Sequence, residues 1–275
     1  MRLAGNVALI TGGARGQGRA HALALAAEGA DIALCDIVSQ LDTVDYAMSS
    51  PEDLVETVRL VESLDRRCIA IPADVSHTRQ VNDMVGAVVD HYGRIDVLVA
   101  NAGIVSYGKM WEITDEMWDQ VIATNLTGVF KVARAVTPHM IEQRRGRVIM
   151  TSSMAARMGL ASLGHYVASK WGVIGLAKTL ALEVAKHGIT VNVICPATVN
   201  TPMVDNDLSY RRFRPELENP TQADMLHRMR TLNPIPEPWS TPEAIARAVV
   251  YLATDEGFIT GSVLDVGLGS TALMP

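Results

Sequence analysis

Short apolar segments rich in β-branched residues alternate along the chain with longer amphipathic segments. The short ones have the length of strands, and the longer ones place apolar residues at helical spacing. Because helical crossovers join successive strands, the strands are expected to pair in parallel and to be covered on both faces. The predicted strands are Val7–Thr11, Asp31–Asp36, Cys68–Pro72, Val97–Asn101, Arg147–Thr151, Thr190–Cys195 and Ser262–Val266.

These elements predict an α/β fold with a doubly wound parallel sheet, which is Rossmann-like, with seven strands and helices on both faces. One domain accounts for residues 1–275, although the length alone also allows two small domains. The predicted helices are Gly18–Glu28, Pro51–Leu64, Val81–Tyr92, Glu116–Glu142, Tyr166–His187 and Pro242–Ala253.

Two connections exceed the usual length. Residues 38–50 form an insertion after the second strand. Residues 200–241 carry many prolines and charges without sustained periodicity, so they form either a disordered insertion or a lid. A lid is favoured by the apolar residues that would anchor it, namely Met203, Leu208, Phe213, Met225, Leu226, Met229 and Trp239.

The charge balance argues against a nucleic-acid partner. The formal net charge is −6 and the pI is about 5.6, whereas a phosphate backbone requires a basic stripe. The one tight basic cluster is Arg211, Arg212 and Arg214, which we interpret as a solvated loop.

Cysteine usage predicts a reducing compartment. Cys35, Cys68 and Cys195 are odd in number, widely spaced and mostly flanked by apolar residues, which favours reduced core thiols over disulfides or a metal site. The first apolar run is too short for a signal peptide, and no later stretch approaches ~20 uninterrupted apolar residues. We therefore expect a cytoplasmic protein with no membrane segment and no metal.

A glycine-rich turn follows the first strand. Gly12, Gly16 and Gly18 allow a tight turn, close approach of the backbone to a pyrophosphate and close packing of the next helix, whose N-terminus favours anions. The preceding strand, the following helix and an acid at the end of the second strand strengthen this otherwise weak signal.

That acid is Asp36, eighteen residues after Gly18. Its carboxylate can accept hydrogen bonds from ribose hydroxyls and would repel a 2′-phosphate, which favours NAD over NADP. Arg15 is the opposing signal, since a cation in the turn could hold that phosphate. The alternative for Asp36 is a turn residue at a strand end.

Together, several motifs resemble those of the short-chain dehydrogenases/reductases over essentially the whole chain. They are TGGARGQG after the first strand, Asp74-Val75 after the third, Asn101-Ala102-Gly103 after the fourth, Asn125, Ser153, and YVASK from Tyr166 to Lys170. The resemblance implies an NAD-dependent alcohol dehydrogenase. It implies that the cofactor is bound by Gly12, Arg15, Gly16, Gln17, Gly18, Asp36, Ile37, Asp74, Val75, Asn101, Ala102, Gly103, Tyr166, Lys170, Pro196, Val199 and Thr201.

Two positions depart from the family pattern. Ala197 stands where the family usually has glycine after Pro196, which leaves less room beside the nicotinamide and makes the backbone near Val199 less certain. Ala100 replaces a second asparagine before Asn101, which puts little in doubt.

Within this resemblance, the proton chemistry falls to Tyr166 and Lys170, which are four residues apart on one helix face. The Lys170 ammonium and a positive nicotinamide are expected to lower the pKa of the phenol, so that Tyr166 acts as general acid or base. Ser153 would polarise the substrate oxygen, with Ser152 as its rival.

Two neighbouring residues leave alternatives open. The resemblance gives Asn125 a local helix break, from which its backbone and a water relay the proton towards Lys170, whereas the residue pattern alone would suggest a helix-surface side chain. His165 is interpreted as structural or pocket-lining.

The substrate is expected over the nicotinamide, between Ser153, Tyr166 and the lid. An apolar pocket would suit a small hydrophobic alcohol or ketone, with the alternative that its apolar residues are ordinary core. Apolar residues on more than one face of the two longest helices suggest subunit contacts, and family members are usually tetramers, so a homotetramer is expected. The predicted pocket residues are Ser153, Met154, Leu160, Met203 and Trp239.

A narrower resemblance rests on ARGQGRAHA, SSPEDLVETVRLVE, NLTGVF, GHYVASKWGVIGL, VNTPM and FRPELENP. These segments resemble the carveol-dehydrogenase-like group of actinobacteria. That resemblance implies a nicotinoprotein, in which NAD does not exchange, the insertion helps to bury it and the redox peptide mycofactocin takes the electrons. The alternatives are an ordinary dehydrogenase with exchanging NAD and, with least support, a non-catalytic NAD-binding protein.

Overall fold

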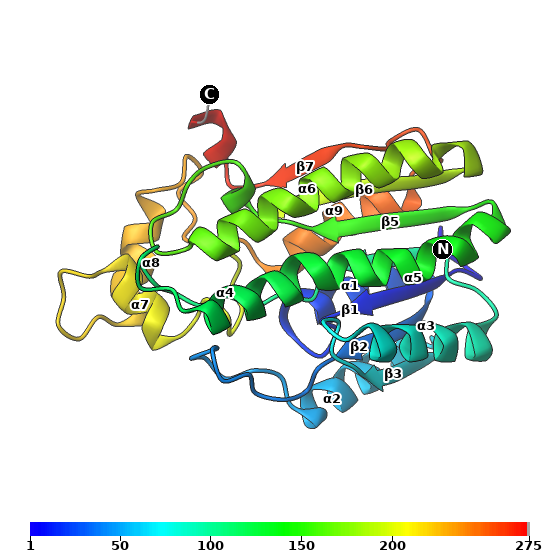
Figure 1. The fold of residues 1–275 in the computed structure, drawn as a ribbon, viewed down its shortest axis with the longest axis horizontal. Helices are drawn as coiled ribbons and strands as arrows, with labels where there is room; N and C mark the ends of the chain where they lie inside the picture. The colour runs from blue at the N-terminus through cyan, green and yellow to red at the C-terminus, as the bar shows by residue number, and fades with distance from the viewer. Residues whose placement is uncertain (274–275) are drawn as a thin grey trace.

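A seven-stranded parallel sheet forms the centre of the described part of the chain (Figure 1). The computed structural model describes residues 1–273, so the last two residues of the predicted domain lie outside the described residues. The strand order β3-β2-β1-β4-β5-β6-β7 confirms the predicted doubly wound α/β fold. The strands are β1 (Val7–Thr11), β2 (Asp31–Asp36), β3 (Cys68–Pro72), β4 (Val97–Ala100), β5 (Gly146–Thr151), β6 (Ile189–Pro196) and β7 (Val263–Val266).

Helices connect successive strands and lie within a few residues of the predicted ranges. The long helix predicted over Glu116–Glu142 is interrupted by one π-helical segment, η1 (Ala123–Gly128). The α-helices are α1 (Gly16–Ala27), α2 (Pro51–Glu62), α3 (Thr78–Tyr92), α4 (Asp115–Ile122), α5 (Val129–Gln143), α6 (Gly164–Val184), α7 (Asp207–Phe213), α8 (Gln222–Arg230) and α9 (Pro242–Thr254), and the 3-10 turns are η2 (Met154–Ala156), η3 (Ala185–His187) and η4 (Ser270–Leu273).

Two apolar layers hold the helices on the sheet. Successive residues of a strand point to opposite faces. On one face, Leu98 of β4 belongs to the core formed with Val85 of α3 and Val132 of α5. On the other face, Val99 belongs to the core formed with Leu25 of α1 and with α9. Both layers are therefore needed to bury a sheet this apolar, as the strand pattern predicted.

Residues 200–241 are folded rather than disordered. They contain helices α7 and α8, which pack against each other at one end of the molecule (Figure 1). Met225 and Met229 of α8 are 0% and 1% exposed, respectively. Two of the predicted apolar anchors therefore hold this segment in place.

No helix within residues 1–273 combines the length and the apolar character that crossing a bilayer requires.

The carboxyl ends of three neighbouring strands are joined by one side chain. The Asn101 side-chain amide donates to the carbonyl oxygens of Thr11 at 3.1 Å and Gly12 at 3.3 Å. The Thr151 hydroxyl donates to the Asn101 side-chain oxygen at 3.4 Å. The loops that leave β1, β4 and β5 are thereby held against one another at one edge of the sheet.

Replacing Val99 with Ala is expected to lower the free energy of unfolding by about 2 kcal/mol, because two fully buried methyl groups are lost and a cavity remains. Val55→Ala is the matched control, since Val55 is 68% exposed on α2. That control should change stability by less than about 0.5 kcal/mol. Urea unfolding followed by circular dichroism measures both, and equal effects would contradict the described core.

Candidate active site

The turn after β1 needs glycine at the predicted positions. Gly12 and Gly16 have φ values of +67° and +56°, which lie in the left-handed region. A Cβ at Gly18 would lie 1.9 Å from the Gly12 carbonyl oxygen, so only glycine lets α1 pack this closely on the turn. Because α1 begins at Gly16, its unpaired amides border the turn and form a site for an anion such as a pyrophosphate.

A cleft of about 900 Å³, including its open mouth, lies along this edge of the sheet. Thirteen of the seventeen residues predicted to bind the cofactor line this cleft. Tyr166, Lys170, Pro196 and Val199 are not part of its lining. The predicted lining residues are Gly12, Arg15, Gly16, Gln17, Gly18, Asp36, Ile37, Asp74, Val75, Asn101, Ala102, Gly103 and Thr201.

Sequence reasoning missed several lining residues. Met203 was predicted for the substrate, and it also lines this cleft next to Pro202. The narrower resemblance already implied that the insertion helps to bury NAD, but neither it nor the length of the insertion says which side chains turn inward. The missed residues are Cys35, Leu41, Tyr46, Met48, Ser49, Ala73, Ile104, Thr124 and Pro202.

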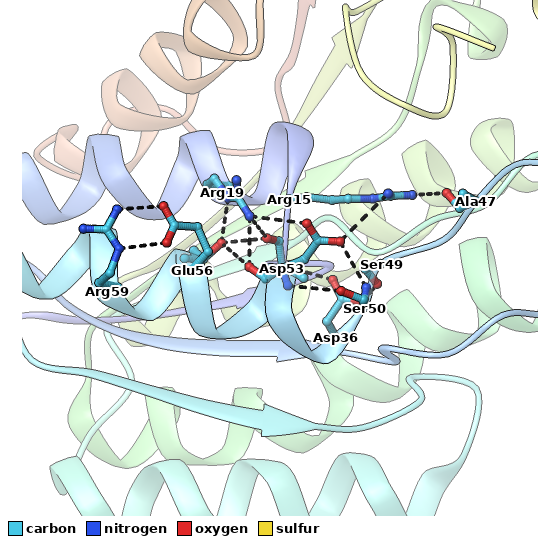
Figure 2. Close-up of polar contacts among 11 residues, drawn as sticks. Arg15, Arg19, Asp36, Ala47, Ser49, Ser50, Asp53, Glu56 and Arg59 are labelled. Atoms are coloured by element: carbon cyan, nitrogen blue, oxygen red, sulfur yellow. Dashed lines mark hydrogen bonds and ion pairs between the residues drawn. The ribbon is translucent and has the colours of Figure 1, made fainter.

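Asp36 ends β2 inside this cleft and is only 8% exposed. Its carboxylate accepts the Ala14 backbone N–H at 2.9 Å and the Ser49 hydroxyl at 2.6 Å, a contact drawn in Figure 2. It is therefore more than a turn residue, because it joins the glycine turn to the insertion. A buried anion here suits ribose hydroxyls and opposes a 2′-phosphate.

Arg15 does not point at a phosphate position beside Asp36. Its guanidinium donates to the Ala47 carbonyl and lies 4.0 Å from the Asp53 carboxylate (Figure 2). The insertion and α2 therefore bind the Arg15 guanidinium, which is the cation that could have held the 2′-phosphate of NADP. The Gln17 side-chain oxygen lines the cleft and is buried without a hydrogen-bond partner in residues 1–273, which leaves an acceptor for a bound ligand. These groups fit NAD.

Helix α6 holds Tyr166 and Lys170 one turn apart, beside the end of β5. The Lys170 Nζ lies 5.6 Å from the centre of the Tyr166 ring and donates to the Thr151 carbonyl at 3.0 Å. The Ser152 hydroxyl donates to the Lys170 carbonyl at 2.7 Å. The Ser153 hydroxyl instead accepts the Ala155 N–H at 3.1 Å and lies close enough to the Tyr166 phenol to act on its pKa. The geometry therefore favours Ser153 over Ser152 as the polar partner.

Burial controls both titratable groups. It raises the pKa of Tyr166 to about 12, and the Ser153 hydroxyl opposes this only in part. Burial also lowers the pKa of Lys170 to about 8. In the protein without nucleotide, burial is the dominant effect on the phenol pKa. The expectation that Lys170 and a positive nicotinamide together lower this pKa concerns the NAD⁺-bound protein, so it stays a prediction.

Asn125 is fully buried in η1, so the helix-surface interpretation is wrong and the predicted local break is confirmed. Its side-chain oxygen accepts the Ile104 N–H at 2.8 Å, and its amide donates to the Ile104 carbonyl at 2.9 Å. A Cβ on Gly103 would lie 3.3 Å from the Asn125 side-chain oxygen and 3.5 Å from the Lys170 Nζ. These two polar groups therefore converge on Gly103.

His165 is buried beside Tyr166 but serves the loop after β4. Its Nε2 lies 2.7 Å from the Ser106 hydroxyl, and burial lowers its pKa. This pairing of a neutral ring with a hydroxyl supports a structural role.

The apolar residues predicted for the substrate pocket lie in three different places. Leu160 and Met203 pack with Tyr166 in a separate apolar cluster that includes Ile104 and Leu163. Met154 belongs instead to the main core. Trp239 is half-buried next to the bridge between Val199 and Ser240 and is outside the cluster around Tyr166.

Among residues 1–273, no group of three or more His, Cys, Asp or Glu side chains is arranged to hold a metal ion.

Known proteins share this sequence and fold. Residues 6–211 match the family described as short chain dehydrogenase. The (−)-trans-carveol dehydrogenase of Rhodococcus erythropolis is 42% identical over 98% of this chain and 99% of its own length. The crystal structure of carveol dehydrogenase from Mycobacterium avium in complex with NAD has a TM-score of 0.96 and 43% identity, covering 98% of this chain and 99% of that chain.

A second solved structure is also similar to this chain in fold and sequence. A short chain dehydrogenase from Mycobacterium paratuberculosis bound to NAD has a TM-score of 0.89 and 40% identity, covering 99% of this chain and 100% of that chain.

Asp36→Asn should raise the Kd for NAD about tenfold, because charge-assisted hydrogen bonds to the ribose are lost. The affinity for NADP should rise relative to NAD, since the repelling charge is gone. Asp31→Asn, at the opposite end of β2, is the control. Calorimetric titration of nucleotide-free protein measures both affinities, and equal behaviour of the two variants would exclude the assigned role of Asp36.

Proposed function

The chain belongs to the short-chain dehydrogenases, and from this premise we propose that it is an NAD-dependent enzyme that interconverts a hydrophobic secondary alcohol and its ketone. The observation that carries the proposal is the placement of Tyr166, Ser153 and Lys170 beside the end of β5, next to the cleft with the glycine turn and Asp36. Bound NAD⁺ supplies the hydride acceptor.

Tyr166 holds the proton that the reaction moves. In oxidation its phenolate removes the alcohol proton, and in reduction its phenol returns one. Ser153 orients the substrate oxygen through its hydroxyl, which already lies beside the phenol. Lys170, anchored on the Thr151 carbonyl, places a cation near the ring and favours the phenolate.

Asn125 completes the set as a positioning residue. Its bonds to Ile104 hold η1 and the loop after β4 together, and its side chain lies close to Gly103 on the side where Lys170 approaches. We assign to η1 the relay of the proton towards Lys170.

The substrate class follows from the apolar cluster beside Tyr166. Leu160, Leu163 and Met203 belong to the same apolar cluster as Tyr166, which suits a cyclic, terpene-like secondary alcohol. The carveol dehydrogenase of Rhodococcus erythropolis supports the same class. Residues 200–241 would act as the lid, since Met203 borders both the apolar cluster and the nucleotide cleft.

We further propose that NAD stays bound between turnovers and that an external carrier, mycofactocin or a similar redox molecule, takes the electrons. The insertion over residues 38–50 supports this, because it lines the cleft through Leu41, Tyr46, Met48 and Ser49. Arg15 and Asp36 join it to the glycine turn (Figure 2). Release of the nucleotide would require these contacts to open.

A homotetramer in the cytoplasm fits the remaining features. Phe130 of α5 and Trp171 of α6 are 42% and 52% exposed, which is costly unless another subunit covers them. Cys35 and Cys195 are buried free thiols, as expected for a reducing compartment.

Tyr166→Phe should lower the rate of alcohol oxidation by about 10²- to 10⁴-fold while NAD remains bound, because only the proton path is removed. Lys170→Met should move the rise of kcat/KM to higher pH, since losing the cation raises the phenol pKa. Lys178→Met, exposed on the same helix, is the control. Activity of Tyr166→Phe within a few-fold of the parent would refute the assignment.

Retention of the nucleotide is tested by denaturing extensively dialysed protein and assaying the supernatant. Stoichiometric NAD is expected, with turnover only when an artificial electron acceptor such as dichlorophenolindophenol is added. Protein that is empty after dialysis and reduces added NAD would be an ordinary dehydrogenase with exchanging cofactor.

A further inference from the structure

The three arginines of the basic cluster at α7, Arg211, Arg212 and Arg214, lie in three different environments. Arg214 donates to the Glu216 carboxylate at 2.5 Å and to the Asp224 carbonyl at 3.1 Å. Arg211 is exposed, whereas Arg212 is half-buried. The interpretation of this cluster as a solvated loop is therefore wrong for Arg212.

Arg212 contacts aromatic rings and no acid. Its guanidinium carbon lies 5.4 Å from the centres of the Tyr107 and Phe213 rings. Within residues 1–273 no carboxylate oxygen lies within 4.0 Å of the guanidinium, and its N–H groups donate no hydrogen bond. Burial lowers the pKa of Arg212, which reflects the cost of holding this cation away from water.

Two acidic residues close to Arg212 in the sequence, Asp205 and Asp207, do not form an ion pair with it. Asp205 accepts the Tyr210 hydroxyl at 2.5 Å and the Gln222 amide at 2.8 Å. Asp207, at the start of α7, is exposed. A cation that is partly desolvated and lacks a counter-ion provides binding free energy for an anion that enters from outside the chain.

Tyr107 links Arg212 to the proposed active site. The Tyr107 ring packs in the same apolar cluster as Tyr166, Leu160 and Met203, and its hydroxyl is close enough to raise the pKa of Tyr166. Arg212 stacks on this ring, so its charge lies one aromatic side chain away from the phenol. The Tyr107 hydroxyl also lies 3.5 Å from the Ser209 hydroxyl, and because one of the two donates to the other, one O–H group remains free.

We propose that Arg212, with Tyr107, forms an anion subsite that selects secondary alcohols carrying a carboxylate at the far end of an apolar skeleton. The inference rests on the proposed function of Tyr166. One guanidinium matches the single charge of a carboxylate and presents it with paired N–H donors. A phosphate dianion would leave one charge uncompensated, so a hydroxy acid is the better match.

The test compares two alcohols of similar shape, 3-hydroxycyclohexanecarboxylate and 3-methylcyclohexanol. The parent enzyme should have a higher kcat/KM for the hydroxy acid, and Arg212→Gln should reduce the ratio of the two kcat/KM values about 10- to 100-fold, mainly through KM. Arg212→Lys should restore part of the preference. Arg211→Gln, one residue away and exposed, should keep the parent ratio.

A binding measurement separates this inference from the proposed function. Calorimetry should detect cyclohexanecarboxylate on the NAD-loaded parent and much weaker binding of cyclohexylmethanol, with the difference lost in Arg212→Gln. Failure to oxidise either alcohol would reject the proposed function while the binding result still tests the subsite. An unchanged ratio, equal binding of both probes, or an equal loss of kcat for both alcohols in Arg212→Gln would overturn the inference.

Discussion

Asn101 joins the carboxyl ends of β1, β4 and β5 through hydrogen bonds to the backbone of β1 and from the hydroxyl of Thr151. Without this tie, the glycine turn and the loops carrying Gly103 and Ser153 could move independently. A dinucleotide needs its phosphate and nicotinamide sites at a constant separation. The asparagine therefore couples the anion site at the start of α1 to the phenol on α6.

Charged side chains have different kinds of partner in the supporting structure and in the cleft. Away from the cleft, several charges are paired, as Arg94 with Asp96 at 2.5 Å and Arg2 with Glu28 at 2.7 Å. Among the described residues, Asp36 and Lys170 have only neutral partners, in the form of N–H, hydroxyl and carbonyl groups. Neutral dipoles keep a charge in position without cancelling it, so its field remains available to a ligand. The Arg212 guanidinium also has neutral neighbours, namely two aromatic rings.

Much of this arrangement could be predicted from the sequence because it rests on local rules. Alternation of strands and helices, glycines at fixed spacing and an acid after β2 each have one simple structural solution. The misassigned residues required tertiary information. Met154 lies one residue after Ser153, yet it packs into the main core, where a Cβ at Gly267 would meet its sulfur at 2.9 Å. Arg212 stood within a basic run, and spacing alone could not show that Tyr107 lies beneath it.

The pKa shifts could not be predicted from residue spacing either, because they depend on how deeply each group is buried. The four-residue interval between Tyr166 and Lys170 correctly places them together, but burial raises the pKa of Tyr166 and lowers that of Lys170. With a pKa of about 8, Lys170 still carries its charge at neutral pH, whereas the phenol is protonated. A phenol with a pKa near 12 is protonated at neutral pH, so it is not available as a base.

A second positive charge would come with the oxidised nucleotide, whose nicotinamide ring is cationic, whereas the reduced ring is neutral. Tyr166 is consequently expected to give up its proton beside the oxidised form and to keep it beside the reduced form. On this argument, the direction of proton transfer follows the redox state of the bound nucleotide, and a site that burial alone would leave inactive becomes a base only when a hydride acceptor is present.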